Sequence, residues 1–119
     1  MVKVLIVDEE PVSEVYAEFL DFKGYEVLTA STASEALKVL GQNQDITQVI
    51  TELRLPGIHG ADLIHTIRKN YSLVKVFVCT ADHSCAIDLK RRKSVGLITG
   101  YILKPHRLQE LSDYLDHNK

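Results

Sequence analysis

The sequence has no long hydrophobic run. Hydrophobic residues make up 45% of the chain, yet none of its apolar stretches approaches the roughly 20 residues that span a bilayer. The first stretch, Val4 to Val7, is followed by Asp8, Glu9 and Glu10, a pattern unlike a secretory signal. We therefore expect a soluble, cytoplasmic protein that does not bind membranes.

Cysteine and histidine are too few and too scattered for a metal centre or a catalytic triad. Cys79 and Cys85 form no CxxC pair, and the five histidines show no HxxxH pairing, so a zinc site is not expected. Cys79 lies inside an apolar run, where a thiol usually acts as a small buried hydrophobe. No serine occupies a GxSxG elbow. These absences argue against an enzyme.

Excess positive charge is also missing. The net charge of −2 argues against general affinity for nucleic acid, and no helix-turn-helix pattern is present. The one basic run is Lys90 to Lys93. Four consecutive basic residues point around a helix rather than along one face, which favours a solvated helix end over a site for an acidic partner.

No linker or low-complexity tract divides the 119 residues, so we expect a single domain over residues 1–119. Short apolar runs recur along it and predict five β-strands. They are VKVLIVD (2–8), YEVLTA (25–30), QVITEL (48–53), VKVFVCT (74–80) and GYILK (100–104).

Helical patterns separate these strands. A stripe from Val12 to Leu20 predicts a helix that ends near Gly24. The spacing of Thr32 and Glu35 fits a capping box and predicts a second helix ending near Gly41. Three more are expected: one with Ile64, Ile67 and Tyr71, one over roughly 83–95, and one with Leu108, Leu111 and Leu115. Alternating strands and helices predict a doubly wound α/β fold with a five-stranded parallel sheet.

Charged and hydroxyl side chains stand where the predicted strands end. They are Asp8, Glu9, Glu52, Thr80 and Lys104. Because parallel strands end at one edge, we expect these side chains to meet there. No glycine follows the first strand, so the edge suits a cation better than a phosphate loop. Glu9, Glu52 and a nearby backbone carbonyl predict a weak Mg²⁺ site, whose remaining negative charge Lys104 would balance.

Four segments resemble the signature segments of the response-regulator receiver family of two-component signalling. They are VLIVDEEP, VITELRLPGIHG, VFVCTA and GYILKP, in the family's order and spacing. The resemblance covers essentially the whole chain and implies a flavodoxin-like sheet with strand order 2-1-3-4-5.

The resemblance also assigns roles to individual residues. It implies that Asp8 and Glu9 are the acidic pair for Mg²⁺, that Arg54 offers a backbone carbonyl ligand, and that a cis peptide bond precedes Pro105. Thr80 would be the switch hydroxyl, Tyr101 the switch aromatic and Lys104 the phosphoryl-contacting lysine. Glu52 takes the position of the phosphorylated aspartate, beside the other metal ligands.

Glutamate at position 52 is a departure from the family. Its additional methylene advances the carboxylate by about an ångström, and a misplacement of that size costs on the order of 10²-fold in rate. The same carboxylate could reach toward Lys104 and Thr80 and imitate the phosphorylated state. We therefore hypothesise a phosphorylation-independent or constitutively biased receiver. Its partner would be a histidine kinase or another signalling protein, an effector domain or target, or a second copy.

Other interpretations stay open. The chain could be an ordinary phosphoaccepting receiver that tolerates Glu52 or uses Asp8 instead. A flavodoxin-like ligand-binding domain is the alternative of another class. We also expect an ion pair between Arg54 and Asp82 beside the pocket, and a turn at His59. The resemblance places the partner surface at 90–93, Tyr101 and 108–115.

Overall fold

The computed structural model describes residues 2–57 and 59–119, so Ile58 of the VITELRLPGIHG segment lies outside the described residues. The strands are β1 (Lys3–Val7), β2 (Glu26–Ala30), β3 (Ile46–Thr51), β4 (Lys75–Thr80) and β5 (Gly100–Leu103). The helices are α1 (Val12–Phe22), α2 (Ala33–Gln42), α3 (Gly60–Asn70), α4 (Ala86–Ser94) and α5 (Leu108–His117), with a 3₁₀ turn, η1 (His83–Cys85), before α4.

In the described part of the chain, every helix falls short of the length and apolar character that crossing a bilayer requires.

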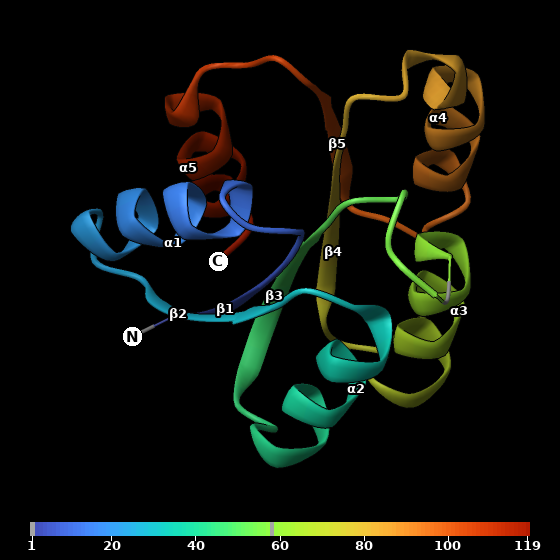
Figure 1. The fold of residues 1–119 in the computed structure, drawn as a ribbon. Coiled ribbons are helices and arrows are strands. Elements are labelled where there is room, and N and C mark those ends of the chain that lie inside the picture. The colour runs from blue at the N-terminus through green and yellow to red at the C-terminus, as the bar shows by residue number, and fades with distance from the viewer. Residues whose placement is uncertain (1, 58) are drawn as a thin grey trace.

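The strands form one parallel sheet in the order β2-β1-β3-β4-β5, which confirms the predicted fold (Figure 1). β1 lies in the middle of the first three strands, where Val7 pairs with Ala30 on one side and Thr51 on the other. β4 joins the other edge of β3 and pairs in turn with β5. Each predicted strand overlaps an observed one, although β3 begins at Ile46, two residues before the predicted start.

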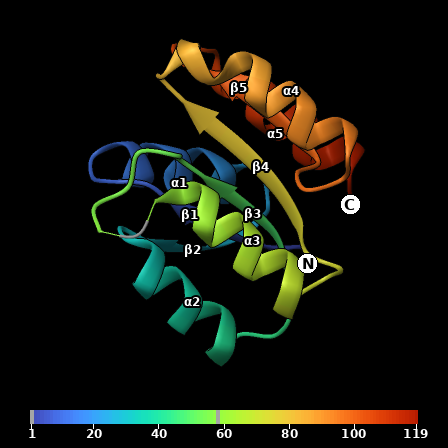
Figure 2. The ribbon, with the colours of Figure 1, turned by 90° about the vertical axis from the view of Figure 1, so that its right-hand side faces the viewer.

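Helices cover both faces of the sheet (Figures 1 and 2). α2, α3 and α4 cover one face, and the core beneath them includes Ala36, Leu63 and Leu89. α1 and α5 cover the other face, where Tyr16, Leu20 and Leu111 lie over the sheet. Strands covered on both sides must be apolar throughout, which explains why β1 and β4 read as continuous hydrophobic runs.

Local hydrogen bonds set the helix starts. Thr32 Oγ1 accepts a hydrogen bond from Glu35 N at 3.1 Å, the first half of the predicted capping box. Glu35 Oε2 does not return to Thr32 but accepts from the backbone N and the hydroxyl of Ser31, at 3.3 and 3.2 Å. The predicted fourth helix divides into η1 and α4 because Asp82 Oδ1 accepts from Ser84 N at 3.1 Å and stabilises a tighter first turn.

Gly60 holds the start of α3 against the end of β3. A Cβ atom built on Gly60 would lie 2.7 Å from both the carbonyl oxygen of Glu52 and the Cα of Leu53. Both are backbone atoms and cannot rotate away. Gly60 N also donates to the Leu53 carbonyl at 3.0 Å. The absence of a side chain at position 60 therefore allows the α3 terminus to support the backbone that carries Glu52.

We predict that Gly60→Ala lowers the free energy of unfolding by about 2 kcal/mol, because the added methyl group forces this backbone apart. Denaturant unfolding measures the change. Gly41→Ala in α2 is the matched control, since its new Cβ would meet only the Tyr71 hydroxyl at 3.8 Å. Equal destabilisation by both substitutions would show that the close approach at Gly60 does not matter.

Candidate functional site

The carboxyl ends of four strands bring the predicted site residues to one edge of the sheet. Asp8 follows β1, Glu52 follows β3, Thr80 ends β4 and Lys104 follows β5. Parallel pairing aligns these ends, as in the pair of Thr80 with Leu103. Asp8 and Glu52 are only 7% and 8% exposed, and Thr80 is fully buried. The site is therefore a largely desolvated cluster of acidic side chains.

Lys104 is the cation that balances these two acids. Its Nζ lies 2.7 Å from Asp8 Oδ2 and 3.8 Å from Glu52 Oε1. The Lys104 side chain is 17% exposed, so the ammonium is mostly withdrawn from water. Two nearly buried carboxylates this close to each other would repel strongly without it. The closer contact goes to Asp8 rather than to Glu52.

The Glu52 carboxylate turns back toward its own backbone. Its Oε2 accepts a hydrogen bond from Leu53 N at 2.6 Å. The predicted approach of Glu52 to Lys104 is present, but the Thr80 hydroxyl is used elsewhere and accepts from Asp82 N at 3.1 Å. One carboxylate oxygen of Glu52 is thus occupied by the main chain, and the other faces the ammonium.

An ion pair between Arg54 and Asp82 connects the loop after β3 with the loop after β4, as predicted. Arg54 Nε donates to Asp82 Oδ2 at 2.9 Å. Hydrogen bonds from Ser84, then Arg54 and Cys85, hold the pKa of the Asp82 carboxyl well below its usual range. The Arg54 side chain is 63% exposed, so solvent screening keeps the stabilisation from this pair small.

Two contacts to Lys104 are ones that sequence reasoning missed. The His83 Nε2 atom lies 2.6 Å from the Lys104 carbonyl oxygen. On the other side, the Lys104 ammonium lies 6.0 Å from the centre of the Tyr16 ring, whose hydroxyl is hydrogen-bonded to His106 Nε2 at 2.7 Å. Burial raises the pKa of the Tyr16 hydroxyl. Tyr16 was visible in the sequence only as part of the buried stripe of α1.

The predicted Mg²⁺ ligands are only partly gathered. Asp8 and Glu52 both approach Lys104, whereas Glu9 is exposed, and its backbone N donates to Asp8 Oδ1 at 2.8 Å. Within residues 2–57 and 59–119, no three His, Cys, Asp or Glu side chains lie close enough to hold a metal ion together. Two carboxylates still suit Mg²⁺, which binds few protein ligands and keeps several waters. The assignment of Asp8, Glu9, Glu52 and Arg54 as ligands stays a prediction.

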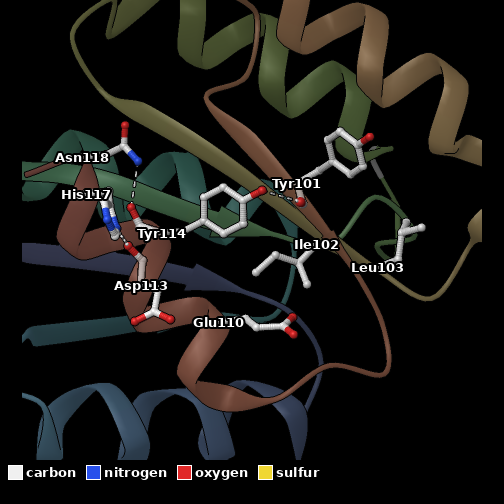
Figure 3. A pocket seen from close by; sticks show the side chains of 8 residues that line it. All are labelled: Tyr101, Ile102, Leu103, Glu110, Asp113, Tyr114, His117 and Asn118. Atoms are coloured by element: carbon white, nitrogen blue, oxygen red, sulfur yellow. Dashed lines mark hydrogen bonds between the residues drawn. The ribbon is translucent and has the colours of Figure 1, made fainter.

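Tyr101 lies on β5 beside a groove of about 680 Å³ formed with α5 (Figure 3). Its half-buried ring packs on the α2–α3–α4 side of the sheet, while Ile102 belongs to the core under α1 and α5. The Tyr114 hydroxyl donates to the Tyr101 carbonyl oxygen at 3.3 Å. Glu110 and Asp113 also line this groove.

The peptide bond before Pro105 is cis, as the resemblance implies.

This fold and its acidic edge define the receiver class of signalling domains, and comparisons confirm that class. The family model of the response regulator receiver domain matches residues 4–116, so the chain belongs to that family. Because the family match covers residues 4–116, the receiver interpretation takes the place of the alternative, a flavodoxin-like ligand-binding domain.

Individual proteins similar to this chain are consistent with membership of the receiver family. A receiver domain protein from Clostridium thermocellum superposes with a TM-score of 0.90 at 28% identity, over 98% of this chain and 93% of that one. The response regulator TrrA from Thermotoga maritima, solved in complex with Mg(2+)-BeF, gives a TM-score of 0.86 at 31% identity over 98% of both chains. The uncharacterized transcriptional regulatory protein YrkP from Bacillus subtilis is 34% identical over 92% of this chain. The chain spans about half the length of such curated relatives, 46% of YrkP.

Lys104 gives a direct test of the charge balance. We predict that Lys104→Met lowers the free energy of unfolding at neutral pH by about 3 kcal/mol, because two desolvated carboxylates lose their cation. Lys104→Met combined with Asp8→Asn should recover a large part of that loss, since only one acid then remains. Urea unfolding of the two single variants and the double variant measures the coupling. Strictly additive effects would contradict the arrangement.

Proposed function

We propose that this chain is a receiver domain with a degenerate acceptor, which signals by binding other proteins and does not depend on phosphorylation. The observation that carries the proposal is the position of the Glu52 carboxylate. One of its oxygens accepts from Leu53 N at 2.6 Å, and the other lies 3.8 Å from Lys104 Nζ. The carboxylate thus has main-chain and ammonium partners already.

The phosphoryl transfer expected of a receiver places strict demands on this position. A carboxylate oxygen attacks phosphorus in line, the P–N bond to a donor phosphohistidine breaks, and the imidazole leaves with the bonding electron pair. Asp8, Glu9 and Glu52, with the Arg54 carbonyl, would hold Mg²⁺, which would neutralise charge on the phosphoryl oxygens. Glu52 begins the attack one methylene farther from its backbone than an aspartate, so we expect poor alignment.

The same carboxylate imitates the modified state only in part. It presents one negative charge to Lys104, whereas a phosphoryl group brings nearly two charges and three acceptor oxygens. Lys104 is in addition held more closely by Asp8, at 2.7 Å. Thr80 bonds to Asp82 N and not to Glu52. We infer a partial bias toward the active arrangement, completed when a partner binds.

The partners we propose are a histidine kinase or another signalling protein, and an effector domain or separate target. Support comes from the family and from relatives such as YrkP, which is named a transcriptional regulatory protein. YrkP is about twice as long as this chain, which matches 46% of it. The surface formed by α4, β5 and α5, which includes Tyr101 and its groove, is the proposed docking face.

A second candidate is phosphorylation at Asp8. Its carboxylate is the one that contacts Lys104 directly, so it has the cation that an acceptor needs beside it. Substitution of Asp8 distinguishes this candidate from transfer to Glu52.

Exposure to a small phosphodonor with Mg²⁺, followed by intact mass analysis, tests the proposal. We expect no phosphoryl adduct on the native chain, and an adduct on Glu52→Asp, because the shorter side chain restores the attacking distance. Glu52→Gln and Asp8→Asn serve as controls for the two possible acceptors. A stoichiometric adduct on the native chain that disappears in Glu52→Gln would overturn the proposal, and one that disappears only in Asp8→Asn would establish the second candidate.

A further inference from the structure

The outward face of α1 is acidic and has no internal partner. Residues 9–22 contain five acidic and no basic side chains. Glu14 and Glu18 are exposed on α1, and no ion pair among residues 2–57 and 59–119 involves them. Between and beside them lie Val15, 49% exposed, and Phe22, 84% exposed. We call Glu14, Val15, Glu18 and Phe22 the α1 face.

The outward face of α4 has the opposite charge. Its nine residues, Ala86–Ser94, include four basic side chains and one acidic side chain. Asp88 pairs with Arg91 and Arg92 at 2.9 and 2.7 Å, which leaves a surplus of positive charge on the helix. Leu89 is buried, so Ile87, Lys90 and Arg91 point outward, and Ile87 is 85% exposed. We call Ile87, Lys90 and Arg91 the α4 face.

The two faces are opposite in charge, and each carries exposed apolar surface: Val15 and Phe22 on the α1 face and Ile87 on the α4 face. On each face, charged residues of a single sign lie beside exposed hydrophobic surface, a combination that suits docking between two helices. They cannot meet within one molecule, because α1 and α4 cover opposite faces of the sheet (Figure 1). The complementary surface must belong to another molecule.

α5 is a poorer match for the basic α4 face. Two of its acids already accept hydrogen bonds from their own chain, Asp113 from Gln109 Nε2 at 3.0 Å and Asp116 from Tyr25. The large hydrophobic side chains that are exposed belong to α1, α4 and the loops at Leu73 and Val95, and none of those described lies on α5. Charge and apolar exposure therefore coincide on α1.

We propose that the α1 face of one copy docks on the α4 face of a second copy, so that the chains associate head to tail. Such a contact uses two different surfaces, so a pair of copies keeps one free α1 face, on one copy, and one free α4 face, on the other, where further copies bind. Two short helices bury a small area, and the association is accordingly weak and sensitive to salt. The contact does not involve the acceptor site at Glu52, and its failure would leave the proposed function untouched.

Sedimentation of the 119-residue chain over a range of concentrations tests the proposal. We expect the average mass to rise with concentration beyond that of a dimer, and the association constant to fall by about tenfold between roughly 0.05 and 0.5 M NaCl. A chain that stays monomeric at low salt, or that stops at a dimer, overturns the head-to-tail arrangement.

Charge reversal sharpens the test. Lys90→Glu/Arg91→Glu and Glu14→Lys/Glu18→Lys should each remain monomeric alone, because both helix faces then carry one sign. An equal mixture of the two variants should associate again, since each supplies the face that the other lacks. Lys38→Glu/Lys69→Glu, on the exposed surfaces of α2 and α3, is the matched control and should associate like the native chain. Circular dichroism confirms folding of all variants.

A mixture that stays monomeric overturns the proposal, because a second copy is then not the occupant. Loss of association in the control does so too, since only net charge would then matter. If Lys90→Glu/Arg91→Glu stays monomeric and Glu14→Lys/Glu18→Lys still associates, the acidic surface lies outside α1 and the proposal is wrong.

Discussion

One ammonium group, that of Lys104, holds the acidic edge of this sheet together. Asp8 and Glu52 are almost fully buried and lie at the ends of different strands, where their charges have little water to screen them. Lys104 Nζ contacts both. The parallel sheet makes this possible, because residues separated by about a hundred positions in the chain arrive at the same edge.

The preference of Lys104 for Asp8 sets the character of the site. A lysine shared unequally between two acids has a direct hydrogen bond to one and a looser electrostatic contact with the other. Glu52, which has the longer contact with Lys104, also accepts a hydrogen bond from Leu53 N. The carboxylate in the acceptor position is therefore stabilised mainly by its own backbone, and the glutamate side chain is long enough to fold back in this way.

The fold could be predicted from the sequence almost completely. Apolar runs located all five strands, since strands covered on both faces need hydrophobic side chains throughout. Boundaries were less accurate where polar residues lie inside an element. β3 extends back to Ile46, beyond the exposed Thr47 that interrupts the apolar run. Gln48, where the predicted strand begins, is buried, and its amide donates to the carbonyl oxygens of Leu115 in α5 and of Asn118 just after it. A glutamine in a core strand has no signature until its partners are known.

The site was predictable at the level of residues but not of contacts. Strand ends identified Asp8, Glu52, Thr80 and Lys104, because their placement follows from topology alone. The direction of each side chain does not. The return of Glu52 to Leu53 N, the Thr80 contact with Asp82 N and the His83 contact with Lys104 depend on loop geometry that hydrophobic periodicity does not encode.

Lys104 makes two contacts. Its ammonium group pairs with Asp8, and its carbonyl oxygen is hydrogen-bonded to the His83 ring at the start of η1. Any event that draws the ammonium off Asp8 would have to move the side chain while the main chain stays tied to that 3₁₀ turn, or else shift the turn as well. Lys104 thus connects the acidic site to the turn that leads into α4. A change of charge at Asp8 or Glu52 that leaves the sheet unaltered can therefore reorient α4 through this residue.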